Sequence, residues 1–291
     1  MSYAPEQLFV SQPSLSAGIK KLEKELDATL FERGGRTVLL TPAGHLFQER
    51  ARAIVAEYQS VRQDLQQLKD KPTLRIATLH SIRGNSIAEL ISKFHKQYPN
   101  VFIELCNGCL PDLQDWLEQG KADLALTWLR EQDDDQNSQF LFHQPLALAV
   151  PSNHTFAQIK SACLADLNEQ PYIKRLNCEF WQLYPKLFDQ AGVIPHMVYA
   201  SNNEEWVISL IQAGVGMSIM PVWDDLTHIT YIPMTDLSLS RTIGLQWRRQ
   251  QNFDVVNWFR NFVVEQDWQV ACSSLCQKAD MQLDKSLPSQ E

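Results

Sequence analysis

The chain has 291 residues, more than one ordinary hydrophobic core organises, so we expect two or three compact units. Its 44% hydrophobic and 21% charged content is typical of a globular protein, and no apolar run reaches the roughly 18 to 20 residues that cross a bilayer, which excludes a membrane-spanning protein. The net charge of -8 argues against a protein that coats nucleic acid indiscriminately.

This charge is unevenly distributed. Residues 1–70 hold nine basic and nine acidic side chains, so the remaining 221 residues, with 17 basic and 25 acidic, carry the whole excess. Any contact with nucleic acid should therefore lie in the first segment and depend on how its charges are arranged. The N-terminus lacks a basic segment followed by an apolar one, so we expect no secretory signal, a cytoplasmic protein and six reduced cysteines.

The first strong pattern is helical and begins near Ser11, which suits an N-cap. Apolar residues then recur at spacings of four, three and four, which predicts one buried stripe of Leu15, Ile19, Leu22 and Leu26. The opposite side carries short polar residues followed by two lysines. Such a face can reach base edges with its N-terminal residues and phosphates with its lysines. An ordinary amphipathic surface helix is the alternative.

Two short strands around a Gly-Gly turn are expected next, from Leu30 to Arg36 and from Thr37 to Thr41. A small hairpin beside a recognition helix would be a wing, whose arginines would meet the phosphate backbone. The residues that we expect to contact DNA are Ser11, Gln12, Pro13, Ser14, Ser16, Lys20, Lys21, Arg33 and Arg36.

A third helix is predicted from the N-cap Thr41 and from Pro42 in the first helical position. Its apolar residues alternate steps of four and three over three heptads, as in helices that pair with another helix. This seam consists of Phe47, Ala51, Ile54, Tyr58, Val61, Leu65 and Leu68. At about 1.5 Å per residue the helix would be roughly 40 Å long, which favours dimerisation over a place in the core of one domain.

The run VSQPSLSAGIKKLEKELDATLFERGGRTVLLTPAGHL resembles the winged helix-turn-helix of LysR-type transcriptional regulators. It contains V-S-Q-P-x-L-S, K-K-L-E, L-F-E-R and L-T-x-A-G in the family's order, and the segments GKADLAL and AGVGMSIMP also follow the family's pattern. The resemblance implies a regulator that binds double-stranded DNA, responds to a small-molecule effector and forms a homodimer or homotetramer. RNA polymerase is a further expected partner. Because the family has one more helix before this run, the resemblance implies either a truncated DNA-binding domain or a start codon assigned too far downstream.

From Thr73 onward, strand-like and helix-like segments alternate, which predicts a mostly parallel α/β sheet. Strands are expected at 73–78, 101–106, 123–127, 140–150, 172–175, 196–200, 216–220 and 242–248, and helices at 86–98, 113–119, 179–190, 204–212 and 255–264. Crossings near Pro151 and Thr242 would join two lobes around a hinged cleft, as in periplasmic binding proteins.

The expected architecture is α/β overall. It comprises a truncated winged helix-turn-helix at 1–41, a linker helix at 42–71, a two-lobed periplasmic-binding-protein-like effector domain at 72–270 and a polar tail at 271–291. Lobe I would hold residues 72–148 and 243–270, and lobe II residues 149–242.

Ligands of such sheets bind at the carboxyl ends of the strands. This topology, together with the resemblance, gives the effector-binding candidates His80, Ser81, Asn107, Cys109, Leu110, Trp128, Asn177, Cys178, Ser201 and Asn202. An aromatic residue after a strand, such as Trp128, is more often packed than free to bind. The polar set suits a small polar or anionic effector, for which Arg83 and Arg175 are candidate clamps.

Two other functions stay open. Cys106 and Cys109 form a C-x-x-C that would suit a redox- or metal-responsive regulator, although Cys106 is expected to end a strand and point into the core. A truncated family member could also bind ligand or partner subunits without reading DNA. The sequence has no G-x-S-x-G, P-loop, H-E-x-x-H or strand-linked G-x-G-x-x-G motif, so we expect no enzyme activity, cofactor or metal ion.

Overall fold

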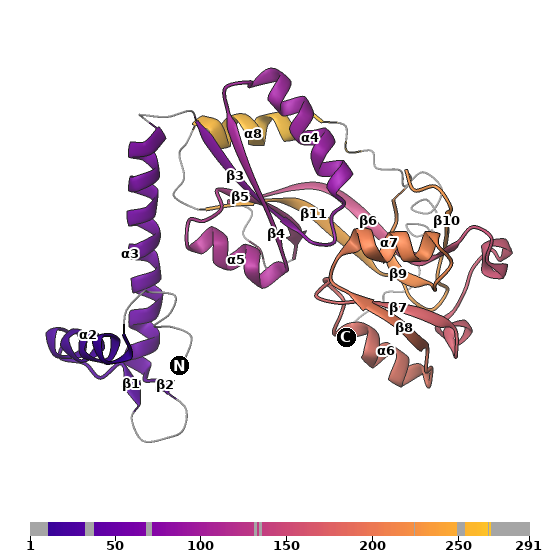
Figure 1. Cartoon of the computed structure of the whole chain (residues 1–291), viewed down its shortest axis with the longest axis horizontal. Helices are drawn as coiled ribbons and strands as arrows, with labels where there is room; N and C mark the ends of the chain where they lie inside the picture. Colours follow the sequence, from indigo (N-terminus) through magenta and orange to yellow (C-terminus); the bar gives the residue numbers. More distant parts are fainter. Residues whose placement is uncertain are drawn as a thin grey trace, which may run out of the picture. The chain divides into compact units, whose positions relative to one another are not determined.

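A computed structural model (Figure 1) describes residues 11–32, 38–67, 72–130, 133, 136–223, 225–248, 254–266 and 268. The chain divides into two compact units, one made mainly of residues up to Gln66 and one made of most of the chain from Gln67 onward. Three predicted site residues, Arg33, Arg36 and Leu68, and the tail 271–291 lie outside the described residues. Within those residues, no helix has both the length and the apolar character to span a membrane.

The first described helix of the N-terminal unit is α2 (Gln12–Glu25), capped by Ser11 as predicted. Its apolar stripe is less buried than we expected. Leu15, Ile19 and Leu22 are only partly buried, and Leu26 is 43% exposed. The prediction of a buried stripe was wrong because, among the described residues, so small a unit offers little apolar surface for a helix to pack against.

The predicted hairpin is confirmed as strands β1 (Phe31–Glu32) and β2 (Leu39–Leu40), which pair antiparallel. Helix α3 (Pro42–Gln67) follows, with Thr41 as its cap. The Thr41 hydroxyl accepts a hydrogen bond from the N–H of Gly44 at 2.9 Å and donates one to the carbonyl of Thr29 at 2.6 Å. A Cβ on Gly44 would lie 2.1 Å from the carbonyl oxygen of Leu30, so only glycine lets the helix approach the wing this closely.

The predicted seam of α3 changes from partly buried to exposed along the helix. Phe47 and Ala51 are partly buried. Beyond them Ile54 is 68% exposed, Tyr58 67%, Val61 48% and Leu65 57%. Apolar side chains repeated at heptad spacing and left open to water are what a helix presents to a partner helix.

Lobe I of the second unit is a mixed sheet covered by helices. Its strands are β3 (Thr73–Leu79), β4 (Phe102–Gly108), β5 (Leu124–Leu129) and β11 (Ser240–Trp247), and its helices are α4 (Gly84–Gln97), α5 (Leu110–Glu118) and α8 (Asp254–Val264). Strand β3 pairs in parallel with β4 and β5, as expected, whereas β11 pairs antiparallel with β5. The buried carboxylate of Asp123 accepts the N–H of Arg75 at 2.8 Å and so fastens the start of β5 to β3.

Lobe II is built on the long strand β6. Its elements are β6 (Ser138–Pro151), β7 (Pro171–Arg175), β8 (His196–Ser201), β9 (Ser218–Pro221), β10 (Ile229–Ile232), α6 (Leu183–Ala191), α7 (Glu204–Gln212) and two short 3-10 helices, η1 (Thr155–Gln158) and η2 (Leu164–Leu167). Strands β9 and β10 pair with β6, and β8 pairs with β7. A Cβ on Gly216 would lie 2.8 Å from the carbonyl oxygen of Pro171, so this glycine permits the close turn into β9.

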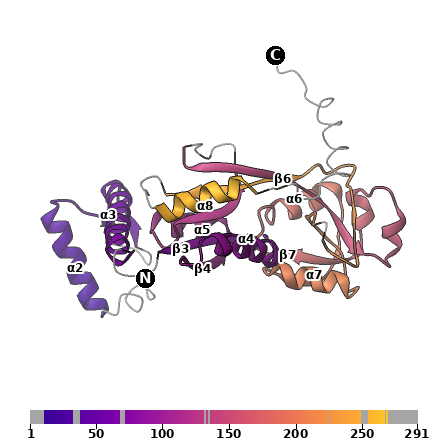
Figure 2. The same cartoon turned by 90° about the horizontal axis from the view of Figure 1, so that it is seen from above.

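The crossing between the lobes lies inside β6. Residues up to Pro145 pair with β11 of lobe I, and residues from Leu146 onward pair with β9 and β10 of lobe II. Figure 2 shows β6 continuing from beside α8 into the second lobe. We expected the crossing at Pro151, but one continuous strand serves both sheets, so the change of lobe comes before its end.

Helix α6 starts later than predicted, at Leu183 instead of Glu179. The intervening residues form a turn, entered through Asn177, whose φ of 55° is left-handed. Helix α5 starts earlier than predicted, at Leu110 instead of Leu113. The first shift leaves Glu179 in a turn instead of a helix, and the second places Leu110, a predicted effector-binding residue, in a helix.

Candidate functional site

The polar face of α2 is open to solvent. All described residues that we expect to contact DNA are exposed, namely Ser11, Gln12, Pro13, Ser14, Ser16, Lys20 and Lys21. Two of their hydroxyls are already engaged, since Ser11 Oγ accepts the N–H of Ser14 at 3.3 Å and lies 2.8 Å from Ser14 Oγ. Gln12 and Ser16 therefore retain the freest short polar groups near the start of the helix, and the two lysines follow one to two turns later.

A carboxylate in the last turn of α2 holds the wing. Glu23 Oε1 accepts hydrogen bonds from the N–H groups of Leu30, at 2.9 Å, and Phe31, at 3.3 Å. Two donors at the start of β1 are thereby tied to the helix, so the orientation of the wing strand relative to α2 depends on this side chain.

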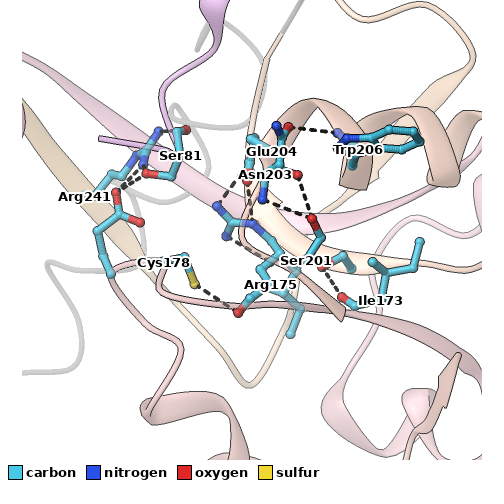
Figure 3. A network of polar contacts seen from close by, with 12 residues as sticks. Ser81, Ile173, Arg175, Cys178, Ser201, Asn203, Glu204, Trp206 and Arg241 are labelled. Carbon is cyan, nitrogen blue, oxygen red and sulfur yellow. Dashed lines mark hydrogen bonds and ion pairs between the residues drawn. The ribbon is translucent and has the colours of Figure 1, made fainter. Parts of the chain in front are cut away.

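In the second unit, the principal polar network joins the two lobes (Figure 3). Arg241, at the start of β11, is 1% exposed. Its Nε donates to Gln144 Oε1 at 2.9 Å, its Nη1 to Ser81 Oγ at 2.7 Å and its Nη2 to the carbonyl of Ser81 at 3.0 Å. The carboxylate of Glu179, from lobe II, completes the network by pairing with Arg241 and accepting the Ser81 hydroxyl at 2.6 Å.

The ionisation of Glu179 is set by this network. Burial raises the pKa of its carboxyl, but the positive charges of Arg241 and Arg175 and the hydrogen bond from Ser81 outweigh burial and hold the pKa below its usual value. Glu179 is therefore charged at neutral pH although its side chain is only 2% exposed.

A second buried ion pair lies within lobe II. Arg175 donates from Nε and Nη2 to the two carboxylate oxygens of Glu204 at 2.9 Å and 3.0 Å, the bidentate geometry that suits a guanidinium and a carboxylate. The two side chains are 2% and 6% exposed. Burial works against the charged form of Arg175, but attraction from Glu204 raises its pKa well above the usual value, so Arg175 stays charged.

Arg83 is the third buried guanidinium near the cleft. It pairs with Asp225, and its Nε lies 4.0 Å from Glu205 Oε1, but both carboxylates are more than half exposed. Arg83 and Arg241 each lie 5.9 Å from the ring centroid of Trp223. Both arginines that we considered as clamps for an effector carboxylate, Arg83 and Arg175, are thus paired with carboxylates of the chain itself.

A pocket of about 370 Å³ opens between the lobes. Its polar lining comes from lobe I through Thr78, His80 and Asn107 and from lobe II through Asn203, Glu204 and Glu205. The buried hydroxyl of Thr78 has no hydrogen-bond partner among the described residues, so it can still serve a ligand. Glu205 Oε1 accepts the N–H of Gly84 at 3.3 Å and so reaches from α7 to the start of α4.

The other effector-binding candidates lie elsewhere. Ser81 belongs to the Arg241 network, and Cys178 is buried with its thiol 3.7 Å from the carbonyl of Arg175. Trp128 packs against the cores of both lobes, with its ring 5.5 Å from that of Phe180. Asn177 and Asn202 are exposed, and Ser201 is partly exposed. Leu110 packs on the core of lobe I, and the Cys109 thiol is hydrogen-bonded to Asp112.

The two cysteines of the C-x-x-C are both free thiols and have different partners. Cys106 is exposed within β4, so our expectation that it points into the core was wrong. Strand β4 lies at the edge of the sheet. Its thiol lies 3.8 Å from the carbonyl of Ile76, whereas the Cys109 thiol contacts Asp112 at 2.8 Å. The pKa of both thiols is raised, mainly by burial and to a smaller extent by a nearby carboxylate, and this disfavours the reactive thiolate. Within the described residues, no group of three or more metal-ligating side chains is found.

Several residues of the site were missing from the sequence-based candidates. Arg241, Gln144 and Glu179 come from three separate segments, and Trp223 comes from a fourth. A buried arginine inside an apolar strand is a signal that could have been noticed, since such a charge needs a carboxylate partner. The identity of that partner carries no local signal.

Comparison with known proteins identifies the protein family. The pattern of the LysR substrate binding domain matches residues 68–268, and that of the bacterial regulatory helix-turn-helix protein, lysR family, matches residues 1–45. The chain belongs to the LysR family. This LysR protein is a DNA-binding transcription regulator with an effector-binding domain, and that reading is favoured over a redox or metal sensor.

The similarity to known relatives covers most of this LysR protein. An uncharacterized HTH-type transcriptional regulator, YybE of Bacillus subtilis, is 27% identical over 267 residues, which cover 90% of this chain and 91% of the relative. Among solved structures, a full-length OxyR variant from Pseudomonas aeruginosa covers 91% of this chain and 92% of its own at 23% identity and a TM-score of 0.57. The Synechocystis CcmR regulatory domain in complex with 2-PG covers 66% of this chain and 96% of its own at 17% identity and a TM-score of 0.57. The two likenesses to solved structures support the fold.

Proposed function

We propose that the exposed face of α2 reads duplex DNA and that a small effector bound between the lobes controls this binding. The observation that carries the first part is the combination of an exposed polar face with a partly buried apolar stripe on one capped helix. Gln12 and Ser16 would reach base edges in the major groove, while Lys20 and Lys21 would bind phosphates. The wing arginines, Arg33 and Arg36, would add backbone contacts.

We further propose that α3 forms a homodimer through its exposed seam, with a homotetramer as the larger assembly, and that the protein acts in the cytoplasm and contacts RNA polymerase. A two-fold dimer presents two recognition helices, so the preferred site should be partly palindromic. Half-sites should lie about one helical turn, or roughly 10 base pairs, or a multiple of it apart.

Selection from a random duplex library tests the DNA-reading part. The wild-type protein should enrich a sequence with two related half-sites, and Gln12→Ala and Ser16→Ala should each relax the preference at particular bases. A matched control is Asn153→Ala, an exposed turn residue in lobe II, which should leave the enriched sequence unchanged. Failure to enrich any sequence would favour a family member that binds ligand or partner subunits without reading DNA.

The effector would occupy the interlobe pocket of about 370 Å³. Among our earlier candidates, His80 and Asn107 line this pocket, and Asn203 and the unpartnered Thr78 hydroxyl add hydrogen-bonding groups. A ligand that contacts both lobes shifts their equilibrium only as far as it binds one arrangement more tightly than the other.

A thermal-shift screen of small polar metabolites against the whole protein tests the pocket. A bound effector should raise the melting temperature of the wild type and not that of Asn107→Leu. The same substitution at the exposed Asn153, Asn153→Leu, should preserve the response. If Asn107→Leu responds as the wild type does, the effector binds elsewhere.

A further inference from the structure

The carboxylate of Glu179 lies in a receptor built by the other lobe. Ser81 follows β3, Gln144 lies in the part of β6 that pairs with β11, and Arg241 begins β11, so all three belong to the lobe I sheet or its edge. Glu179 comes from the turn between β7 and α6 in lobe II. We call Ser81, Gln144 and Arg241 the carboxylate cradle.

The cradle has the chemistry of a carboxylate-binding site. Arg241 supplies a guanidinium with donors in a fixed fork, and Ser81 supplies a hydroxyl that donates to Glu179 at 2.6 Å. Gln144 contributes its amide oxygen, which accepts from Arg241 at 2.9 Å and 2.7 Å and so fixes the direction of the fork. Its amide nitrogen donates to the carbonyl of Val222 at 2.8 Å.

The cradle carries a net positive charge when considered without Glu179. Arg241 is 1% exposed, and its partners in lobe I, Ser81 and Gln144, are neutral. An uncompensated charge at such depth is strongly unfavourable, so the cradle requires an anion. Glu179 meets this requirement from within the chain.

Arg241 differs from the other two buried arginines because its carboxylate partner is both buried and located in the other lobe. The partner of Arg175 is Glu204, in the same lobe. Arg83 does reach carboxylates of lobe II, but Asp225 and Glu205 are 61% and 53% exposed, where solvent weakens ion pairs. Among the described residues, the ion pair of Arg241 with Glu179 is thus the buried one that joins the lobes.

We propose that the carboxylate cradle is an anion-binding site for small carboxylates and that Glu179 is its tethered occupant, which holds the lobes together without a ligand. A free carboxylate enters the cradle only when Glu179 leaves it. In the wild type, Glu179 itself holds the cleft closed. Once its carboxylate is removed, the cleft should close only when an added carboxylate binds the cradle. The inference uses the interlobe cleft of the proposed function, but it concerns a site separate from the effector pocket.

Chemical rescue of Glu179→Ala in the full-length protein tests this inference, with amide hydrogen exchange of residues 79–84 and 176–182 as the readout. Without its carboxylate, the variant should exchange at least about tenfold faster than the wild type in both segments, because opening of the lobes becomes easier. Sodium formate should restore protection, whereas sodium chloride at equal ionic strength should not. The wild type, whose cradle is filled, should show no response to formate.

Two further variants make the result specific. Glu179→Ala combined with Arg241→Met removes the cation and should abolish the formate response. Asp225→Ala removes an interlobe carboxylate that is 61% exposed and leaves Glu205 near Arg83, so exchange of residues 79–84 should stay close to that of the wild type. The proposal is overturned if formate protects Glu179→Ala no better than chloride does, or if Glu179→Ala exchanges like the wild type. None of these readouts involves DNA or the pocket ligand, so failure of the proposed function would be seen separately.

Discussion

Glu23 Oε1 lies 2.9 Å from the backbone nitrogen of Leu30, and this hydrogen bond fastens the helix that we propose reads DNA to the first strand of the wing. Glu23→Ala leaves the N–H groups of Leu30 and Phe31 without this acceptor. We expect a loss of about 1 to 3 kcal/mol from the stability of the N-terminal unit, since hydrogen bonds to charged groups are among the stronger ones. Thermal unfolding of the unit, followed by hydrogen exchange at residues 28–32, measures the loss.

Glu23→Gln is the control for this prediction, because an amide oxygen can still accept both hydrogen bonds. It should retain more of the stability than Glu23→Ala does. Equal losses in the two variants would mean that the acceptor at this position does not hold the wing.

The buried ion pair of Arg175 and Glu204 gives a second prediction. Glu204→Ala leaves a buried guanidinium without its carboxylate, which should lower the free energy of unfolding by about 3 to 5 kcal/mol. The neighbouring Glu205 is 53% exposed, so Glu205→Ala should cost no more than about 1 kcal/mol. Urea unfolding of the two variants compares adjacent carboxylates that differ mainly in burial. Similar midpoints would contradict the pairing.

The lowered pKa of Glu179 predicts a dependence of stability on pH. The positive charges of Arg241 and Arg175 and the hydrogen bond from Ser81 favour its ionised form in the folded state, despite burial. A group whose folded pKa lies below its unfolded value of about 4.3 stabilises the protein above that value, and the contribution is lost as pH falls through the folded pKa. The wild type should therefore be more stable than Glu179→Gln at pH 7.

This advantage should be constant from about pH 6 upward and should shrink as the pH is lowered below about 4. Denaturant unfolding of both proteins across this range measures the difference. A gap between the two proteins that widens on acidification would show that the ionised carboxylate is not the stabilising form.

The exposed seam of α3 predicts the oligomeric state. Ile54→Glu places a charge at a 68% exposed apolar position that we expect a partner helix to cover, so the dimer should dissociate. Ala53→Glu introduces the same side chain at the preceding exposed residue, off the seam, and should leave the assembly intact. Analytical ultracentrifugation distinguishes the two results. Dimers of equal stability in both variants would place the interface elsewhere.

Features with a local signal were predictable from the sequence. The cap Thr41, the start of α3 at Pro42 and both ends of α7 are as expected, because capping groups, proline and periodic apolar residues act within one or two turns. The face of α2 that we propose reads DNA follows from the same logic. It is the side of α2 opposite the apolar stripe, and the structure leaves it exposed.

The polar interior of the cleft could not be predicted in this way. Arg241 lies 97 residues from Gln144 and 160 from Ser81, and such distant contacts leave no periodic trace. Glu179 was expected in the first turn of a helix, where acidic residues are common. Burial opposite Arg241 instead places it in a turn, and only the three-dimensional arrangement of the lobes reveals the pairing.

The salt dependence of DNA binding tests the central claim most directly. Each phosphate neutralised by a lysine contributes about -0.9 to the slope of log affinity against log salt. The double variant Lys20→Ala with Lys21→Ala should therefore bind the selected duplex more weakly, with a slope flatter by about two units. The control with Lys160→Ala and Lys186→Ala, exposed lysines of lobe II, should keep the wild-type slope. A slope unchanged by loss of Lys20 and Lys21 would contradict the account, because DNA would then not lie against this face of α2.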